Sequence, residues 1–328
     1  MRLGRGVLAL TGSAARRSIL VLRALGLGDL LTAVPALRGL RAAHPDHRLV
    51  LAAPEPLRPL TELVDAVDDL LPTAGLGALR RPDAPPALAV NLHGSGPQSI
   101  RDLLTAAPET LLTHRHPHFP DVPGPPWHAD LHEVERWCAL LASAGIATDR
   151  TALRLPAPAR RSEEPDAVIV HPGAASPARR WPAGRFARLA RDLADDGHRV
   201  IVTGSAAERP LAEAVAAGAG LPPDAVYAGR TDLAGLAALV AAAALVVCGD
   251  TGVGHLATAF GTPSVLLFGP TPPWLWGPPA DAPQHVVLWA GRTGDPHGDR
   301  PDPGLLALDL DRVRTAATDL LGLRVRHG

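Results

Sequence analysis

The sequence predicts an α/β protein made of two units, each with a parallel sheet covered by helices. Short apolar runs typical of buried strands alternate with longer stretches whose apolar residues recur at helical spacing, which indicates parallel sheets with helices on both faces. The chain has 328 residues, more than one typical domain holds. A Pro-rich, charged and non-periodic stretch follows Leu155. We therefore expect a first domain at 1–155, a linker at 156–165 and a second domain at 166–328 that closes with a helix.

The first half opens with a short apolar strand, Ile19-Leu20-Val21-Leu22. A turn that contains Gly28 and Asp29 leads to a helix from about Leu30 to Ala43, which Pro45 ends. The other elements expected in this half are a strand at 49–52, a helix at 57–64, a strand at 87–92, a Pro- and His-rich loop at 105–130 and a helix at 133–144.

The second half repeats this rhythm of strand and helix without repeating the sequence. The expected strands lie at 167–170, 199–203, 245–248 and 264–268, and the expected helices at 184–196, 206–217, 233–243, 255–260 and 311–321. The hydrophobic content of 46% is enough to build a core in each half.

The charge of the chain argues against a polyanion such as nucleic acid as its partner, because the formal net charge is −1. All 32 basic residues are arginine, a pattern that indicates GC-rich codon usage. Residues 1–49 carry eight arginines against Asp29 and Asp46. These arginines either attract an anionic acceptor or a membrane surface, or simply lie on solvated helix faces.

The cysteines and the hydropathy pattern point to a cytoplasmic protein. Cys138 and Cys248 both lie in apolar patterns, which predicts buried thiols in a reducing compartment. The N-terminus lacks the layout of a signal peptide, and the uncharged apolar stretch 233–249 is shorter than a membrane span. We expect a monomer whose contact with a membrane is at most peripheral.

A glycine-rich turn at 249–254 is the most informative motif in the chain. The apolar strand 245–248 feeds directly into Gly249-Asp250-Thr251-Gly252-Val253-Gly254, and His255 opens a helical pattern. A helix start presents free backbone N–H groups and a positive dipole end, and glycines let an anion approach the backbone. The turn is either an anion site or an ordinary tight connection between a strand and a helix.

Three further strand ends in the second half carry unusual turns. They are His171-Pro172-Gly173-Ala174, Thr203-Gly204-Ser205-Ala206-Ala207-Glu208 and Phe268-Gly269-Pro270-Thr271. In an open parallel sheet such turns share the edge at which ligands bind. Backbone amides, a carboxylate and apolar walls together suit the phosphates, ribose and base of an ADP- or UDP-type group. None of the turns is a G-x-G-x-x-G fingerprint or a Walker P-loop, which makes a nicotinamide oxidoreductase a distant alternative.

Three segments of the chain, in order, carry a family resemblance. They are I-L-V-L-R-A-L-G-L-G-D-L-L-T-A-V-P-A-L-R-G-L-R (19–41), H-P-G-A-A-S-P-A-R-R-W-P-A-G-R-F-A-R-L-A (171–190) with T-G-S-A-A-E (203–208), and G-D-T-G-V-G-H-L-A-T-A-F-G-T-P-S-V-L-L-F-G-P-T (249–271). In these segments the chain resembles bacterial glycosyltransferase family 9, the ADP-heptose:lipopolysaccharide heptosyltransferase group. The resemblance implies a GT-B fold, in which two Rossmann-like domains face a central cleft. It places the acceptor mainly on the first domain and the nucleotide-sugar mainly on the second.

The resemblance implies that Asp29 is the general base of an inverting transfer, because the family has an aspartate in this turn. A carboxylate beside the acceptor hydroxyl would remove its proton as the oxygen attacks the anomeric carbon. The alternative reading of Asp29 is a plain helix N-cap, and the two roles are compatible. Gly28, His93 and Ser95 are the acceptor-site candidates.

The donor site implied by the resemblance lies in the second half. Arg179 stands where the family commonly has lysine in a K-x-W segment that contacts donor phosphates, and Arg180 could substitute for it. The alternative for Arg179 is a surface arginine beside a buried tryptophan. Asp250, Thr251, Gly252 and Gly254 resemble the family's D-[ST]-G turn, in which we expect Asp250 to bind a sugar hydroxyl or orient a donor group.

Two more donor-site candidates have structural alternatives. His255 either donates to a phosphate or is a structural histidine, and Glu208 either binds ribose hydroxyls or complements a helix dipole. The histidines at 114, 116, 118, 128 and 132 lack the spacing of known metal sites, so we expect no metal or other cofactor.

The sequence thus predicts an inverting, metal-independent glycosyltransferase that moves a heptose-like sugar from an ADP-sugar to an acceptor hydroxyl on a cell-envelope glycan or glycolipid. Two alternatives stay open. One is a GT-B transferase that uses a UDP- or GDP-hexose, and the other is a GT-B scaffold that binds a nucleotide-sugar without transfer.

Overall fold

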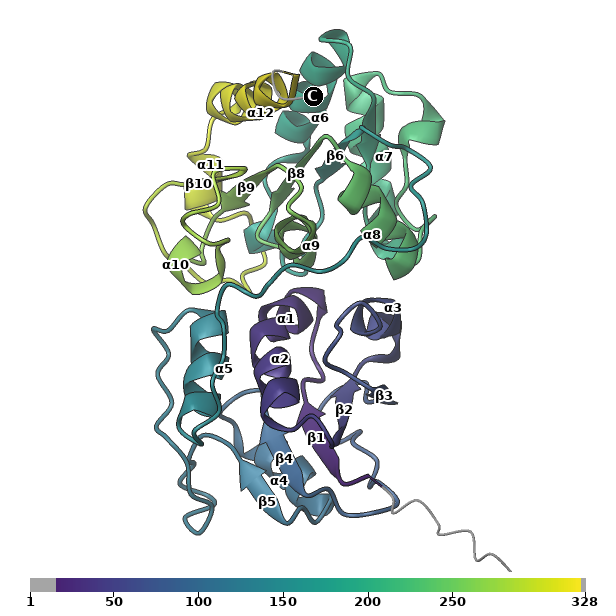
Figure 1. The fold of residues 1–328 in the computed structure, drawn as a ribbon. Coiled ribbons are helices and arrows are strands. Elements are labelled where there is room, and N and C mark those ends of the chain that lie inside the picture. The colour runs from purple at the N-terminus through teal and green to yellow at the C-terminus, as the bar shows by residue number, and fades with distance from the viewer. Residues whose placement is uncertain (1–15, 326–328) are drawn as a thin grey trace, which may run out of the picture.

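The computed structural model describes residues 16–325, and Figure 1 shows them as two α/β units stacked one above the other. Residues 1–15 and 326–328 lie outside the described residues. We call residues 16–142 the first unit and residues 168–325 the second unit. Each unit contains a sheet of five strands, and every strand pair in both sheets is parallel.

The sheet of the first unit has the strand order β3-β2-β1-β4-β5. Its strands are β1 (Ser18–Leu22), β2 (Arg48–Ala53), β3 (Asp69–Pro72), β4 (Leu88–Asn91) and β5 (Thr110–Leu112), and its helices are α1 (Leu27–Thr32), α2 (Val34–Ala43), α3 (Arg58–Thr61), α4 (Pro97–Thr105) and α5 (Glu133–Ala142). The sequence analysis missed β3, α4 and β5. The helix expected at 57–64 is only α3, preceded by a 3-10 turn at Glu55–Leu57.

The first helix differs from the expectation in a way that matters for Asp29. It begins at Leu27 rather than at Leu30, with Gly26 as its N-cap, and it breaks at Ala33 between α1 and α2. Pro35 lies in the first turn of α2, where it has no N–H to continue the hydrogen bonds of α1. Asp29 therefore lies inside the first turn of α1, and its reading as an N-cap is wrong.

The sheet of the second unit has the strand order β10-β9-β8-β6-β7. Its strands are β6 (Val168–His171), β7 (Val200–Val202), β8 (Leu245–Gly249), β9 (Ser264–Phe268) and β10 (His285–Trp289), and its helices are α6 (Ala183–Asp195), α7 (Arg209–Ala219), α8 (Leu233–Ala242), α9 (Gly252–Phe260), α10 (Pro273–Trp276), α11 (Pro303–Leu306) and α12 (Leu310–Val325). The edge strand β10 was missed, and α9 begins three residues before its expected start at His255. The turn at 249–254 is therefore shorter than predicted, and Gly252 is already helical.

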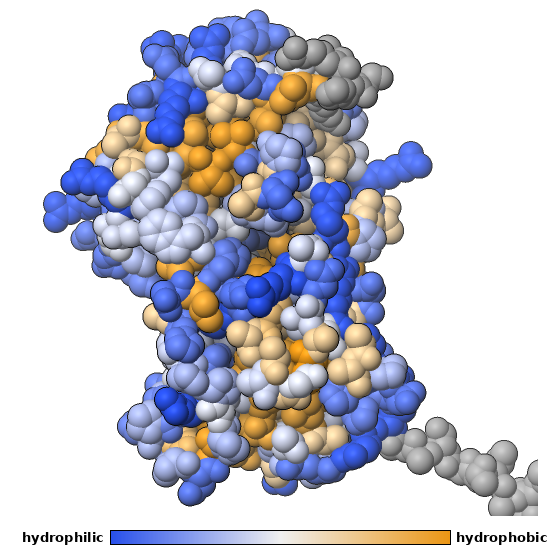
Figure 2. Space-filling view, turned by 60° about the vertical axis from the view of Figure 1, so that its left-hand side comes forward, coloured by the Kyte–Doolittle hydropathy of each residue, from blue (hydrophilic) through white to orange (hydrophobic). Residues whose placement is uncertain are grey.

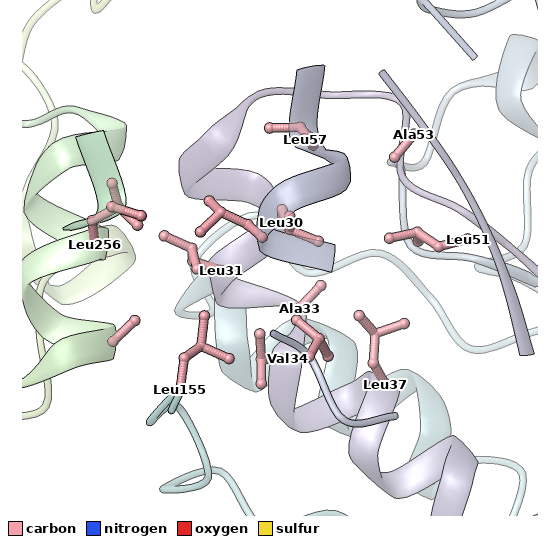
Figure 3. Close-up of a cluster of buried hydrophobic side chains, with 14 of the residues drawn as sticks. Leu30, Leu31, Ala33, Val34, Leu37, Leu51, Ala53, Leu57, Leu155 and Leu256 are labelled. Carbon is pink, nitrogen blue, oxygen red and sulfur yellow. The ribbon is translucent and has the colours of Figure 1, made fainter. Parts of the chain in front are cut away.

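One apolar cluster runs continuously from the first unit into the second. In Figure 3, Leu30 and Leu31 of α1 lie opposite Leu256 of α9, and Leu155 packs beside them. The backbone N–H of Leu155 also donates to the carbonyl of Ala259 at 2.9 Å, which ties the connecting chain to α9. The two units therefore meet through packed side chains at α1 and α9.

The surface shows where the two units join. In Figure 2 they form two lobes that meet at a narrower waist, where hydrophilic side chains reach the surface beside smaller apolar areas. Cys138 and Cys248 are buried free thiols, as predicted. Within residues 16–325, no helix is both long enough and apolar enough to cross a membrane.

The buried His285, at the start of β10, is expected to make the stability of the protein depend on pH. Its Nδ1 lies 2.8 Å from the hydroxyl of Ser264 on β9, and burial, with a smaller effect from Arg154, lowers its pKa from about 6.5 to about 4. The unfolded chain therefore binds more protons between these pH values, so stability is lost as the pH falls from about 6.5 towards 4. We expect His285 to account for at most about 3 kcal/mol of this loss.

Urea unfolding at a series of pH values, for the wild type and for His285→Asn, tests this expectation. The difference between the two profiles isolates His285 from the other buried histidines. The variant should lose less free energy of unfolding across the window, and parallel profiles would contradict the assignment.

Candidate active site

The strand order places the turns that carry the candidate site residues at corresponding positions in the two sheets. The order reverses between β1 and β4 in the first sheet and between β6 and β8 in the second, and such switch points form a crevice at the carboxyl ends of the strands. The turn after β1 and the turn after β8 meet where α1 packs on α9. A cavity of about 880 Å³ lies there and is lined by residues of both units.

Most of the predicted site residues line this interunit cavity. They are Gly28, Asp29, Arg179, Asp250, Thr251, Gly252 and His255. Arg180, Glu208, Gly254, His93 and Ser95 do not line it. Among the lining residues that the sequence analysis missed are Asp130, Trp274, Trp276 and His297, whereas Thr271 belongs to a turn that it expected at this edge.

Asp29 points its carboxylate into the cavity from the first turn of α1. Its Oδ2 accepts the N–H of Gly26 at 3.2 Å, and its Oδ1 lies 3.3 Å from Nη2 of Arg23. Burial raises the pKa of Asp29 above the usual range of an aspartate, and the nearby Glu133 raises it further, whereas Arg23 and the Gly26 N–H oppose the rise. The side chain remains 27% exposed, so an incoming hydroxyl can reach it.

A buried ionic network behind Asp29 was not predicted. Arg23, at the end of β1, is 1% exposed, and its Nη2 donates to Glu133 of α5 at 2.8 Å. Glu133 also accepts hydrogen bonds from Arg136 at 3.1 Å and from the indole of Trp137 at 2.9 Å. Residues 23 and 133 lie 110 positions apart, so no local motif connects them; an arginine directly after a buried strand was the only available signal.

Arg179 lines the same cavity from the second unit, in the loop after β6. Its Nη1 lies 3.3 Å from the carbonyl of Asp250 and 3.9 Å from its carboxylate, while its buried Nε has no hydrogen-bond partner among the described residues. Burial raises the pKa of Asp250, and His255, Arg179 and Thr271 oppose the rise. Arg179 thus has donor groups left over for an anion in the cavity.

The N-terminus of α9 opens into the same cavity. Thr251 is the N-cap residue, yet its side chain makes no cap hydrogen bond, and its buried Oγ1 has no partner among residues 16–325. The first backbone N–H groups of this nine-residue helix lack intrahelical partners. An anion beside Thr251 and Gly252 would meet these groups and the positive end of the helix dipole. Gly254 instead packs against Leu266 and Cys248.

His255 is placed between the two units. Its ring packs edge-on against Trp276 at 6.0 Å between centroids, and burial lowers its pKa, which favours the neutral imidazole. Asp250 opposes this effect. Within the described chain, the ring has no recorded hydrogen bond, so a donor or acceptor nitrogen remains for a ligand.

Glycines allow the close approach of the two helices at the cavity. A methyl group on Gly28 would lie 2.7 Å from Cδ2 of His255, and one on Gly252 would lie 2.8 Å from Cβ of Leu27. Both distances are shorter than ordinary contacts. Gly28 and Gly252 therefore serve the packing of α1 on α9, whatever further part their amides have in binding.

Replacing Gly28 by alanine is expected to lower kcat/KM for the expected sugar transfer by about tenfold. Either the His255 ring turns away or the helices separate, and overpacking of this kind costs about 1–3 kcal/mol. Steady-state kinetics checks the effect. Gly184→Ala on α6, where a methyl group meets no atom within 4 Å, is the matched control and should keep wild-type activity. Equal activity of the two variants would contradict this view of the interface.

Two donor-site candidates lie outside the cavity. The guanidinium of Arg180 donates twice to the carbonyl of Ala174, at 2.9 and 2.7 Å, which makes it a brace of its own loop. Glu208 accepts the N–H and the hydroxyl of Ser205, both at 2.8 Å. Although burial opposes ionisation, these two bonds lower the pKa of Glu208. A methyl group on Gly173 would clash with Glu208, so Gly173 makes room for this carboxylate.

The two remaining acceptor candidates lie on the loop after β4. The N–H of His93 donates to the side chain of Asn91 at 3.1 Å, whereas its buried Nδ1 has no partner among the described residues. Burial lowers the pKa of His93; Arg23 lowers it further and Asp29 opposes the shift. Ser95 is half-buried on the same loop.

The other histidines have structural surroundings. His114 packs edge-on against Trp127, and its Nδ1 lies 3.1 Å from the carbonyl of Pro126. His132 caps α5 through Nδ1, while its Nε2 lies 3.0 Å from the carbonyl of Gly277 in the second unit. Between residues 16 and 325, no three His, Cys, Asp or Glu side chains lie close enough together to hold a metal ion.

A second cavity of about 800 Å³ borders the first at His255 and Trp274, which line both. Its walls come from α5, the segment 150–153, β10 and α12. Of the predicted site residues only His255 lines it, so the candidate chemistry is concentrated in the first cavity.

A family model for glycosyltransferase family 9 (heptosyltransferase) matches residues 125–302, more than half of the chain. The chain belongs to glycosyltransferase family 9. This membership confirms the predicted family and the prediction that the chain is a glycosyltransferase. The matched range contains Arg179, the α9 turn and α5, whereas Asp29 precedes it.

Individual members of family 9 agree with this assignment. The chain is 28% identical to lipopolysaccharide heptosyltransferase 2 of Escherichia coli K12 over 297 residues, which cover 78% of this chain and 83% of the relative. The solved structure of ADP-heptose lps heptosyltransferase II of E. coli superposes with a TM-score of 0.76 at 24% identity, over 94% of this chain and 99% of that one.

A second family 9 structure, from Veillonella parvula, superposes with a TM-score of 0.77 at 21% identity, over 93% of this chain and 97% of that one. These two structural matches, together with the two parallel sheets, confirm the predicted GT-B fold.

Proposed function

We propose that this glycosyltransferase is an inverting, metal-independent enzyme that moves a heptose-like sugar from an ADP-sugar to an acceptor hydroxyl on a cell-envelope glycan or glycolipid. One observation carries the proposal. Asp29 from the first unit and Arg179 with the N-terminus of α9 from the second unit line a single cavity of about 880 Å³. A base from one unit and an anion site from the other then share one cavity, as a displacement at a sugar carbon requires. The heptosyltransferase names of the relatives favour ADP-heptose as the donor.

In this mechanism Asp29 accepts the proton of the acceptor hydroxyl. The acceptor oxygen forms a bond to the anomeric carbon while the bond from that carbon to the diphosphate oxygen breaks, and the electron pair leaves with ADP. Attack from the face opposite the diphosphate inverts the configuration. Because burial and Glu133 raise the pKa of Asp29, its carboxylate is a stronger base than an exposed aspartate.

The leaving diphosphate gains negative charge as the bond breaks. We assign its stabilisation to Arg179, the hydroxyl of Thr251 and the free N–H groups at the start of α9. His255, with its unpaired ring, supplies a further polar contact. Asp250 is a poor ligand for an anion and is assigned to a sugar hydroxyl.

The nucleoside would extend along the edge of the second sheet from α9 towards β7. There Glu208 is held in place by Ser205 and has one oxygen, Oε1, over Gly173. We assign this carboxylate to the ribose hydroxyls. Arg180 holds the loop between the diphosphate position and the ribose position.

The proposal keeps the predicted domains, with the acceptor on 1–155, the linker at 156–165 and the donor on 166–328. Gly28, His93 and Ser95 are assigned to the acceptor side, where His93 lies close enough to Asp29 to feel its charge. A glycolipid acceptor would bring the monomeric enzyme to the inner face of the cytoplasmic membrane as a peripheral protein.

Calorimetry with ADP, UDP, GDP and NAD tests the donor assignment, with Asp250→Ala and Arg179→Ala measured in parallel. Selective binding of ADP that weakens in both variants supports the proposal. A preference for UDP or GDP would favour the alternative of a hexose transferase with the same cavity. Binding of none of them would contradict the donor site.

A further inference from the structure

The guanidinium of Arg23 is shared between the proposed base and a second carboxylate. Nη2 of Arg23 lies 2.8 Å from Oε1 of Glu133 and 3.3 Å from Oδ1 of Asp29. The side chain of Glu133 is 9% exposed, and it does not line the cavity, whereas Asp29 does. The closer of the two ion pairs is therefore that between Arg23 and Glu133, outside the cavity.

We infer that Glu133 is a positioning residue for Asp29, because it holds Arg23 away from a closer ion pair with the carboxylate that accepts the proton. This inference rests on the proposed function. A full ion pair with Arg23 would make Asp29 a weak base, and with no cation nearby a buried aspartate would tend to stay protonated. Sharing one guanidinium between two carboxylates keeps the basicity of Asp29 between these extremes.

Hydrogen bonds hold both members of the closer pair. Nε of Arg23 donates to the carbonyl of Asp29 at 2.9 Å, and Nη1 donates to the carbonyl of Leu92. The guanidinium also lies over the ring of Trp137, 4.9 Å from its centroid. On its other side, Glu133 is fixed by Trp137 and Arg136. Glu133 and the two carbonyl groups therefore hold Arg23 in its position beside Asp29.

The charged groups around Asp29 come from several elements. Arg23 at the end of β1 and Glu133 on α5 are the nearest, and His93 on the loop after β4 also interacts with its charge. Arg179, His255, Asp250 and Asp130 line the same cavity. Arg23 and Arg136 lower the pKa of Glu133 despite its burial, whereas burial raises the pKa of Asp29, so the two carboxyl groups shift in opposite directions.

The pH profile of kcat tests the inference. Transfer requires ionised Asp29, so the rate falls as the pH drops through its pKa. In Glu133→Gln the opposing charge is lost while the shape of the side chain remains. We expect the acid limb to move to lower pH by about one unit, with a lower plateau because the base is weaker. Glu133→Asp, which keeps the charge, should return the acid limb towards its wild-type position.

Glu135→Gln is the matched control, since Glu135 lies on the same helix but pairs with Arg150 at 2.7 Å at the surface. Its profile should equal that of the wild type. An acid limb that stays in place or moves to higher pH in Glu133→Gln overturns the inference. If Asp29→Asn transfers sugar at the wild-type rate, the proposed base itself is wrong, and this outcome is distinct from the first.

A direct titration keeps the inference testable even if Glu133→Gln does not fold. Carbon-13 NMR of aspartate-labelled wild-type protein, with Asp29→Asn used to assign the signal, gives the pKa of Asp29. A value above about 3.9, the ordinary value for aspartate, is the result that burial and the sharing of Arg23 together predict. A value below it would show that Arg23 acts mainly on Asp29 and would overturn the inference.

Discussion

Replacing Asp29 by asparagine is expected to lower kcat for sugar transfer by about 10²- to 10⁴-fold, the usual contribution of a general base. The amide oxygen of asparagine can accept either the N–H of Gly26 or a hydrogen bond from Arg23, and the first of these keeps the start of α1 folded. The main loss would then come from the missing base. Rates measured with ADP-heptose and a heptose-deficient lipopolysaccharide core as acceptor check the effect.

Donor binding provides the control for this variant. Asp29 belongs to the first unit, whereas the diphosphate is assigned to the second, so calorimetry should find ADP binding to Asp29→Asn close to that of the wild type. Unchanged transfer by the variant would exclude Asp29 as the base. A parallel loss of transfer and ADP binding would point to a donor ligand instead.

Replacing Arg179 by glutamine is expected to lower kcat/KM by about 10²-fold, as expected when a preorganised donor to a developing negative charge is removed. The guanidinium contacts Asp250 only at 3.3 Å and beyond, and its buried Nε has no partner among the described residues, so little structure depends on it. ADP binding should weaken as well. Steady-state kinetics and calorimetry on the same preparation separate the two effects.

Arg188→Gln is the matched control for Arg179. Arg188 is an exposed arginine on α6 and does not line the cavity, so the same loss of charge there should leave the kinetics unchanged. Equal losses in the two variants would indicate a long-range effect of net charge. An unaffected Arg179→Gln enzyme would move the phosphate contact to another residue, with Arg180 as the first candidate.

The central strands of both sheets could be predicted because they are buried on both faces and therefore apolar throughout. Strands β1, β6 and β8 show this pattern. Strand β5, by contrast, has three residues in a Pro- and His-rich region and carries too little pattern to recognise. Strand β10 is different, since its Val286-Val287-Leu288 run was a usable signal that the sequence analysis overlooked.

The site residues were predicted from their positions in the turns that follow the strands. Asp29, Arg179 and Asp250 follow β1, β6 and β8, and the parallel order of each sheet brings these turns to one edge. Arg180 and Glu208 satisfy the same pattern but lie outside the cavity, because local partners hold their side chains. The pairing of Arg23 with Glu133 comes from the packing of α5 beside the β1 turn, which no spacing along the chain reveals.

The most direct test of the account is the acceptor-dependent release of ADP from ADP-heptose, measured with the wild type on a heptose-deficient lipopolysaccharide core. We predict that release requires both substrates, that it is matched by heptose on the acceptor with inverted anomeric configuration, and that UDP- and GDP-hexoses do not replace ADP-heptose. Release from a UDP- or GDP-hexose but not from ADP-heptose would contradict the proposed donor. Absence of transfer with every donor, despite nucleotide binding, would contradict the proposal that this cavity performs the reaction.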